Sequence, residues 1–211
     1  MKKATSYKLQ ATILFLFIFS AACSLRPAAC FAEPFYIDHF EKTANLLGGR
    51  TSVYQQEPSR AVAVTTDKEH YGDGTRSIAI RYDKQNSGGP YDSGGWCGYY
   101  SILKAGPKYF DATKYTKLIF WVKGEKGDEN FKVGLADKHW EQLDDSVKSE
   151  DIGIYLKDKK ITTEWQTAEI PLDVFFLDMK ELASVAICFE GDCFPQGKGS
   201  GVVYIDEVAF E

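Results

Sequence analysis

Hydrophobic and polar side chains alternate with a period of two along most of the chain. The clearest alternating runs are residues 60–67, 75–83, 117–124, 130–137, 164–172, 182–190 and 201–210. This alternation places successive side chains on opposite faces of a β-strand. Turn sequences such as GDG (72–74) and NSGGP (86–90) separate the runs, and many short strands of this kind are typical of β-sandwiches and barrels. We therefore predict an all-β fold, with at most one short helix, in residues 173–182.

Two of these runs also predict which face of a strand is buried. Large apolar side chains occupy every second position in residues 131–135 and 185–189. The smaller or polar side chains between and after them are Lys132, Gly134, Ala136, Ala186, Cys188 and Glu190. We expect the large side chains to fill a core between two sheets and the smaller ones to leave a shallow outer trough. The run LIFWV (118–122) has no polar face, which predicts a central strand covered on both sides.

The first 32 residues have a different pattern from the rest of the chain. Three lysines precede an apolar run over residues 11–22, which is too short to span a bilayer comfortably. Small residues follow, in AACFAEP, and the whole segment is typical of a secretory signal peptide. We predict cleavage after Ala32 and a single secreted or periplasmic domain over residues 33–211. The alternative is a lipoprotein anchored at Cys23, the last residue of SAAC.

The predicted mature chain is acidic. Residues 1–32 carry four basic side chains and no acidic one, so their removal changes the formal net charge from −5 to −9. A negative charge of this size opposes binding to nucleic acid. After residue 32 no apolar stretch approaches the length of a transmembrane helix. We therefore expect neither a nucleic-acid partner nor a membrane span.

Motifs for catalysis are absent from the sequence. It contains no GxSxG, HExxH, GxGxxG or P-loop pattern, and its three histidines are scattered along the chain. We therefore predict that the protein is not an enzyme. The alternative is a small hydrolase or lyase, for which Asp137, His139 and Glu190 are the candidate acid and base groups.

Three cysteines remain after the predicted cleavage site: Cys97, Cys188 and Cys193. In an oxidising compartment we expect one pair to form a disulfide, which leaves one thiol. The sequence alone leaves the choice of pair open.

Several short motifs, taken in their order along the chain, resemble a known family. They are FE (40–41), GDGTRS (72–77), FWVKGEKG (120–127), EWQ…IPL (164–172) and YIDEV (204–208). Their order and spacing resemble carbohydrate-binding modules of the galactose-binding-like β-jelly-roll type, most closely those of family 11. The resemblance covers residues 35–211. It implies a two-sheet antiparallel β-sandwich that holds a poly- or oligosaccharide on a concave sheet without altering it, and a structural calcium ion elsewhere.

The resemblance also maps the calcium ligands onto particular acids. Modules of this kind place calcium between the start of the domain, the GDGT turn and the last strand, which implies Glu41, Asp73 and Asp206, with Asp38 as a further candidate. Calcium prefers several carboxylate and carbonyl oxygens, which these positions can supply. The alternative is that these acids only cap the ends of strands.

Recognition of a sugar requires aromatic rings that stack on its C–H face and polar groups that bond its hydroxyls. The candidates for these contacts are Tyr54, Trp96, Tyr99, Asp137, His139, Trp140 and Glu190. Along residues 96–102, Trp96 and Tyr100 lie on the same face of the predicted strand. The alternative for these two rings is that they pack in the core. Tyr99 shares the more polar face and is the better trough candidate. The alternative function is an envelope structural or adhesion protein that binds a protein partner through the same fold.

Overall fold

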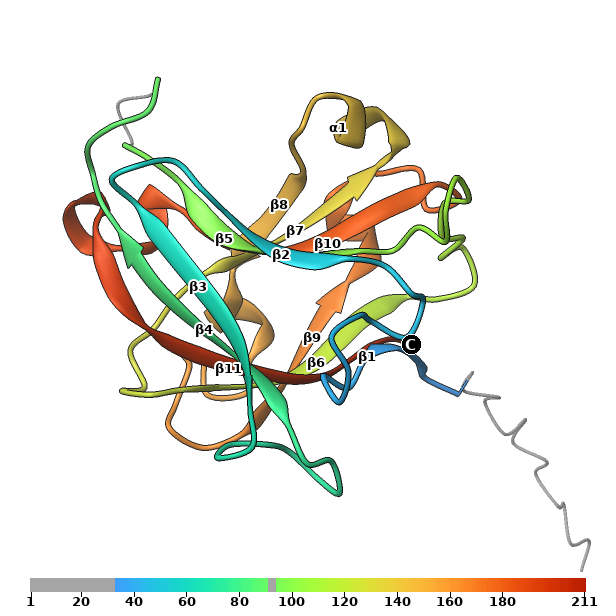
Figure 1. Ribbon diagram of the computed structural model, residues 1–211, viewed down its shortest axis with the longest axis horizontal. Helices are drawn as coiled ribbons and strands as arrows, with labels where there is room; N and C mark the ends of the chain where they lie inside the picture. Colours follow the sequence, from blue (N-terminus) through green and yellow to red (C-terminus); the bar gives the residue numbers. More distant parts are fainter. Residues whose placement is uncertain (1–32, 91–93) are drawn as a thin grey trace, which may run out of the picture. The chain divides into compact units, whose positions relative to one another are not determined.

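A computed structural model describes residues 33–90 and 94–211 of the chain (Figure 1). The predicted signal peptide, with Cys23, lies outside these residues. One antiparallel sheet has six strands, in the order β3 (Arg60–Thr66), β4 (Ser77–Lys84), β11 (Gly199–Phe210), β6 (Lys117–Gly124) and β9 (Gln166–Pro171), with β1 (Phe35–Asp38) also paired to β11. The other has five, in the order β2 (Thr51–Gln55), β5 (Cys97–Ile102), β10 (Leu182–Phe189), β7 (Lys132–Asp137) and β8 (Val147–Asp151).

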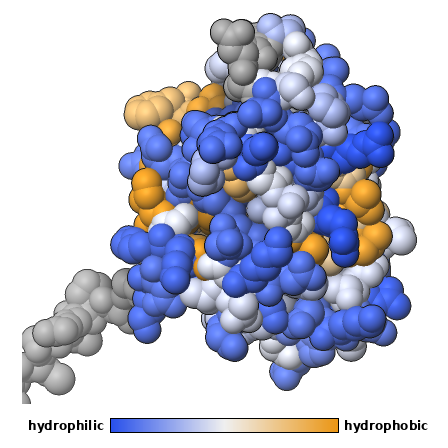
Figure 2. Space-filling model, turned by 90° about the vertical axis from the view of Figure 1, so that its left-hand side faces the viewer, coloured by the Kyte–Doolittle hydropathy of each residue, from blue (hydrophilic) through white to orange (hydrophobic). Residues whose placement is uncertain are grey.

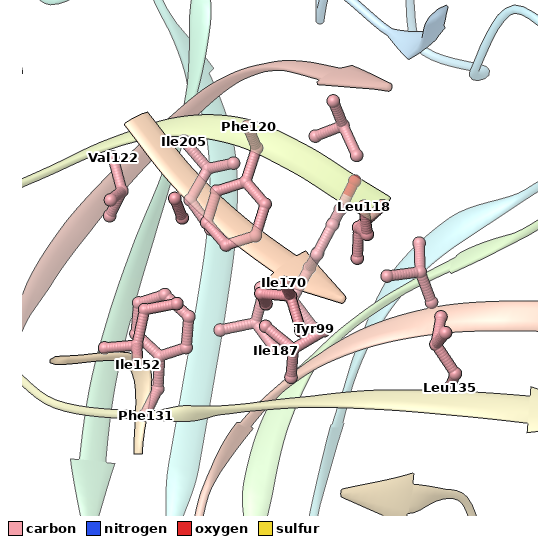
Figure 3. Packing of buried hydrophobic residues seen from close by; sticks show 14 of the residues in the cluster. Tyr99, Leu118, Phe120, Val122, Phe131, Leu135, Ile152, Ile170, Ile187 and Ile205 are labelled. Atoms are coloured by element: carbon pink, nitrogen blue, oxygen red, sulfur yellow. The ribbon is translucent and has the colours of Figure 1, made fainter. Parts of the chain in front are cut away.

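The hydrophobic core lies between the two sheets. Figure 3 shows Phe120 of β6 on one side of this space, and on the other side Leu135 of β7, Ile187 of β10 and Phe131, which directly precedes β7. All four side chains are buried, because each strand turns every second side chain inward. The structure thus confirms the predicted all-β sandwich, and it confirms the inner and outer faces predicted for β7 and β10.

Strand β6 is central, as its apolar sequence predicts, because it pairs with β11 on one side and β9 on the other. Its inward side chains are buried, but Ile119 and Trp121 on the outer face are only half-buried. The prediction that both faces are covered is therefore wrong for the outer face. An apolar strand leaves an aromatic ring partly open to solvent there.

The described residues contain little helix. The α-helix α1 (Lys138–Gln142) follows β7, and short 3₁₀ turns occur at η1 (Ile152–Tyr155), η2 (Leu172–Phe175), η3 (Gly191–Cys193) and η4 (Pro195–Gly197). The helix expected in residues 173–182 is reduced to η2, and β10 begins at Leu182. None of the helices in residues 33–90 and 94–211 has the length and apolar character needed to cross a membrane. The side shown in Figure 2 is mostly hydrophilic, with small separate hydrophobic patches.

The three cysteines of the described chain are buried free thiols, so the predicted disulfide is wrong. Cys97 lies on the inner face of β5, whereas Cys188 lies on the outer face of β10, where it pairs with Gly98. The sheet therefore separates these two side chains. Cys193 lies in η3, with its Sγ 3.7 Å from Asp151 Oδ1. Burial raises the pKa of Cys97 and Cys193 to about 12 and that of Cys188 to about 11.

Candidate functional site

The outer face of the five-stranded sheet carries two adjacent rows of side chains that cross its strands. One row consists of Ser52, Tyr100, Ala186, Gly134 and Lys148. The next row consists of Tyr54, Gly98, Cys188 and Lys132. Aromatic side chains thus come from β2 and β5 at one side of this face, small residues lie in the middle, and lysines come from β7 and β8.

The tyrosine ring of Tyr54 lies over Gly98. A Cβ atom placed on Gly98 would be 2.5 Å from the Tyr54 Cζ and hydroxyl oxygen, so only glycine leaves room for the ring. Burial raises the pKa of Tyr54 well above its usual value, and the neighbouring Cys188 adds to the shift. Similarly, Ser146 Oγ lies 2.5 Å from the Cβ position of Gly134. Tyr54 and Ser146 therefore cover Gly98 and Gly134, so this part of the face is not an open trough, and Tyr54 and Tyr100 form an aromatic surface there.

A network of charged side chains borders this aromatic surface. Lys148 Nζ lies 2.9 Å from Asp145 Oδ1 and 3.9 Å from Glu190 Oε1. Burial raises the pKa of Glu190, although the positive charge of Lys148 opposes the shift. Lys132 Nζ pairs with Asp192 Oδ2 at 2.5 Å. These ion pairs fix hydrogen-bond donors and acceptors next to the small residues of β7 and β10. The hydroxyls of a ligand on this face could bond to them.

The structure reverses the two faces predicted for β5. Tyr99 points between the sheets, close to Ile187 in Figure 3, and is only 6% exposed, so its assignment to the outer surface is wrong. Tyr100 lies on the outer face instead, half-buried and opposite Ala186. Trp96, two positions before Gly98, is half-buried and its ring approaches the Cβ position of Gly89 to 3.4 Å. Tyr100 is therefore the surface aromatic that the sequence analysis missed.

Asp137, His139 and Trp140 lie together where β7 passes into α1. Asp137 is buried and caps the helix, because its Oδ1 accepts hydrogen bonds from the backbone N–H of His139 at 2.9 Å and of Trp140 at 3.0 Å. Its Oδ2 accepts the N–H of Asp178 at 3.1 Å. The carboxylate is thus occupied by the backbone. His139 is exposed and Trp140 half-buried, with their rings edge to face at 5.8 Å, and α1 lies above the five-stranded sheet in Figure 1.

The acid and base groups named for a hydrolase are not brought together. Asp137 pairs with Leu182 at one end of β10, whereas Glu190 follows Phe189 at the other end. The eight residues of β10 separate the two ends, which corresponds to roughly 20–25 Å. The two carboxyl groups therefore cannot act on one glycosidic bond, since such pairs lie within about 10 Å of each other.

The acids named for calcium lie near the β1–β11 pair and the loop before β4, and backbone groups already bind most of them. Asp206 is buried, and its two oxygens accept the N–H groups of Tyr71 at 2.8 Å and Glu207 at 2.9 Å. Glu41 accepts the N–H of Thr75 at 2.6 Å. Burial, together with the nearby negative charges of Glu207 and Glu41, raises the pKa of Asp206 to about 6.

The other two acids named for calcium differ in their surroundings. Asp38 is buried and accepts the N–H of Phe40 at 2.7 Å, whereas Asp73 is exposed. Among the described residues, no three His, Cys, Asp or Glu side chains are placed to hold a metal ion. As the side chains stand, Glu41 and Asp206 are close enough to interact electrostatically but do not form a complete coordination shell.

A sequence model of the family described as "Carbohydrate binding domain 30" matches residues 40–211. The chain belongs to this family. The resemblance to carbohydrate-binding modules predicted from the sequence is thereby confirmed, and the family is numbered 30, whereas the motifs pointed most closely to family 11. No curated protein matches this family 30 chain at a significant level.

Solved structures share the fold of this family 30 chain at low sequence identity. A family 11 module of the cellulosomal cellulase Lic26A-Cel5E of Clostridium thermocellum is 16% identical, with a TM-score of 0.58 over 84% of this chain and 94% of that one. The family 30 module of Cel9D-Cel44B from the same organism is 18% identical, with a TM-score of 0.54 over 85% of this chain and 92% of that one. A β-1,2-glucanase from Parabacteroides distasonis matches with 16% identity and a TM-score of 0.58 over 84% of this chain but only 24% of its own length.

Proposed function

We propose that this carbohydrate-binding domain is an exported, non-catalytic protein that holds a poly- or oligosaccharide on the outer face of its five-stranded sheet. The observation that carries the proposal is the Tyr54 ring, which lies over Gly98 next to Tyr100, beside the small residues of β7 and β10. A ring fixed in this way offers its face to the C–H groups of a sugar, and the Lys148–Asp145 pair offers hydrogen bonds to the hydroxyls. One related fold, a family 11 module, is known in complex with a β-1,3-1,4-mixed-linked tetrasaccharide.

Replacement of Tyr100 by alanine is expected to weaken binding to soluble mixed-linked β-1,3-1,4-glucan about tenfold. Loss of one stacking ring costs about 1.4 kcal/mol, which is a tenfold change in affinity. Affinity electrophoresis in gels that contain the polysaccharide measures the change. The control is Tyr54→Phe at the neighbouring ring, because it keeps the ring and removes only the hydroxyl. We expect it to bind within about threefold of the unaltered protein.

Circular dichroism melting of each variant checks that the fold is intact. Equal retardation of Tyr100→Ala and the unaltered protein would contradict the proposed binding site on this face. If mixed-linked glucan does not retard the unaltered protein, β-1,2-glucan is the next probe, and absence of binding to every glucan would contradict the proposed class of ligand.

Calcium is proposed as a stabilising ion at the β1–β11 end of the six-stranded sheet. The support is electrostatic: the buried Asp206 carboxyl has a raised pKa, partly because Glu207 and Glu41 lie near it, and a divalent cation would neutralise this group of charges. Glu41, Asp206, Asp73 and a backbone carbonyl such as that of Tyr71 would hold the ion. Because backbone N–H groups bond to Asp206 and Glu41, binding of the ion would require the oxygens of these two acids to reorient.

Export is proposed from the N-terminal sequence pattern. Expression of the full chain in a secreting host is expected to yield a protein that begins at Glu33, because cleavage follows the small residues Cys30 and Ala32. Intact mass spectrometry of the exported protein measures the new terminus. A mass that corresponds to a lipid-modified Cys23 would support the lipoprotein alternative instead.

A further inference from the structure

We propose a second glycan-binding site on the outer face of the six-stranded sheet, which takes a single sugar residue of a neutral polysaccharide. The site is a pocket of about 300 Å³ whose aromatic walls come from Tyr36 on β1, Tyr71 in the loop before β4 and Trp121 on β6. It faces away from the aromatic surface around Tyr54, because the two sheets lie back to back across the core.

The first wall is an aromatic pair held in place by the backbone. Tyr71 and Trp121 stack with ring centroids 3.5 Å apart and an interplanar angle of 15°. The loop that carries Tyr71 is fixed because its N–H donates to the buried Asp206 Oδ2 at 2.8 Å. Trp165, which precedes β9, adds a third ring at 6.3 Å from Tyr71, edge to face. Two of the four tryptophans of the chain therefore gather on this face.

The second wall and the rim supply the remaining groups that a sugar requires. Tyr36 is 39% exposed and packs on His39, with ring centroids 4.5 Å apart. Asp73, Glu207 and Thr167 complete the lining of the pocket. His39 Nδ1 contacts Glu207 Oε2 at 2.9 Å, which orients the glutamate and leaves its Oε1 on the side of Gly74. The pocket thus joins aromatic rings to carboxylate and hydroxyl oxygens at one rim.

This composition favours a sugar over purely apolar ligands and over anionic ligands. A purely apolar ligand could not bond to the oxygens of Asp73 and Glu207, whereas sugar hydroxyls can donate to them. An anionic ligand would be repelled by Asp73 and Glu207. The volume is at the lower end of the roughly 300–1,000 Å³ typical of small-molecule sites, so the pocket admits one ring and suits a chain end or a branch.

The aromatic character continues along the sheet from the pocket. Lys123, the next outward residue on β6, lies 6.0 Å from the Trp165 ring and 5.6 Å from the Tyr204 ring, and its Nζ is paired with Glu69 at 2.7 Å. These rings extend the surface on which neighbouring sugar units can rest once the pocket holds the first. Two sites on opposite sheets would let one domain hold two polysaccharide chains, with a gain in avidity on insoluble material.

The four tryptophans allow the two faces to be observed separately. The variant Trp96→Phe/Trp140→Phe keeps Trp121 and Trp165 as the remaining tryptophans of the protein. We expect titration of this variant with the mixed-linked tetrasaccharide to give a saturable change in tryptophan emission. Adding Tyr36→Ala is expected to raise the Kd of this change at least fivefold. Adding Phe176→Ala, which removes a 93% exposed ring away from the pocket, is expected to leave it unchanged.

Affinity electrophoresis of the same proteins keeps this proposal distinct from the proposed function. If the unaltered protein is retarded by glucan but the Trp96→Phe/Trp140→Phe protein shows no change in emission, the second site is overturned and the face around Tyr54 stands. If Tyr100→Ala binds normally while Tyr36→Ala abolishes retardation, the pocket is a binding site and the face around Tyr54 is not. No emission change and no retardation together would overturn both. Melting curves confirm that each variant is folded.

Discussion

Gly98→Ala is expected to lower the free energy of unfolding by about 2–3 kcal/mol and to abolish binding at the face around Tyr54. The added Cβ would lie 2.2 Å from the carbonyl oxygen of Ile187 and 2.5 Å from the Tyr54 ring. The Ile187 carbonyl belongs to β10, a backbone that cannot yield without disturbing its pairing with β5. The Tyr54 ring would therefore be pushed off the sheet and the two strands strained together. Urea unfolding and affinity electrophoresis measure the two effects.

A double variant separates these two contributions. Gly98→Ala combined with Tyr54→Ala removes the clash with the ring but keeps the clash with the Ile187 carbonyl. We expect this protein to remain destabilised relative to Tyr54→Ala alone, because a backbone contact is responsible for most of the cost. Full recovery of stability in the double variant would show that the ring was the obstacle. Unchanged stability and unchanged binding in Gly98→Ala would contradict the position of Tyr54 itself.

The fold could be predicted from the sequence because period-two alternation survives in most strands. In β7 and β10, bulky side chains at every second position identified the inner face correctly. Both faces of β5 carry aromatic rings, so the prediction of its outer face depended on polar residues alone, and it was wrong. Ser101 suggested an outer face, yet it is buried and its hydroxyl accepts a hydrogen bond from Asn45 Nδ2 at 2.8 Å. A buried polar group with a partner 56 positions away leaves no local sequence signal.

The same lack of long-range information explains the errors in the candidate site. Cysteine count and compartment suggested a disulfide, but strand register decides which side of the sheet each thiol occupies. Asp137 looked like a ligand to sugar, although an Asp before a short polar segment is also a helix N-cap signal, and this second interpretation describes the structure. The pocket of Tyr36, Tyr71 and Trp121 joins three distant segments, so only pairing of β11 with β1 and β6 reveals it.

A second large effect is expected in the pH dependence of stability without calcium. Folding raises the pKa of Asp206 from 3.8 to about 6, so ionisation of this carboxyl lowers the free energy of unfolding by about 3 kcal/mol. Because the pKa is higher in the folded state, the stability contributed by the protonated Asp206 carboxyl is complete below pH 4 and is lost as the pH rises through 6. Calcium would bind the ionised form, so at pH 7 an excess of about 100 times its Kd is expected to restore about 2.7 kcal/mol.

Comparison with Asp206→Asn isolates this group from the other carboxyls, several of which have lowered pKa values and act in the opposite direction. In chelator, the melting temperature of the unaltered protein is expected to fall relative to that of Asp206→Asn between pH 4 and 7. Calcium should then raise the melting temperature of the unaltered protein but not that of the variant. Asp111→Asn, at an exposed aspartate bonded to Thr113, is the matched control and should keep the calcium response. If the melting temperatures of the unaltered protein and Asp206→Asn change in parallel with pH in chelator, the raised pKa is refuted. If they diverge but calcium has no effect, the calcium site is refuted and the raised pKa stands.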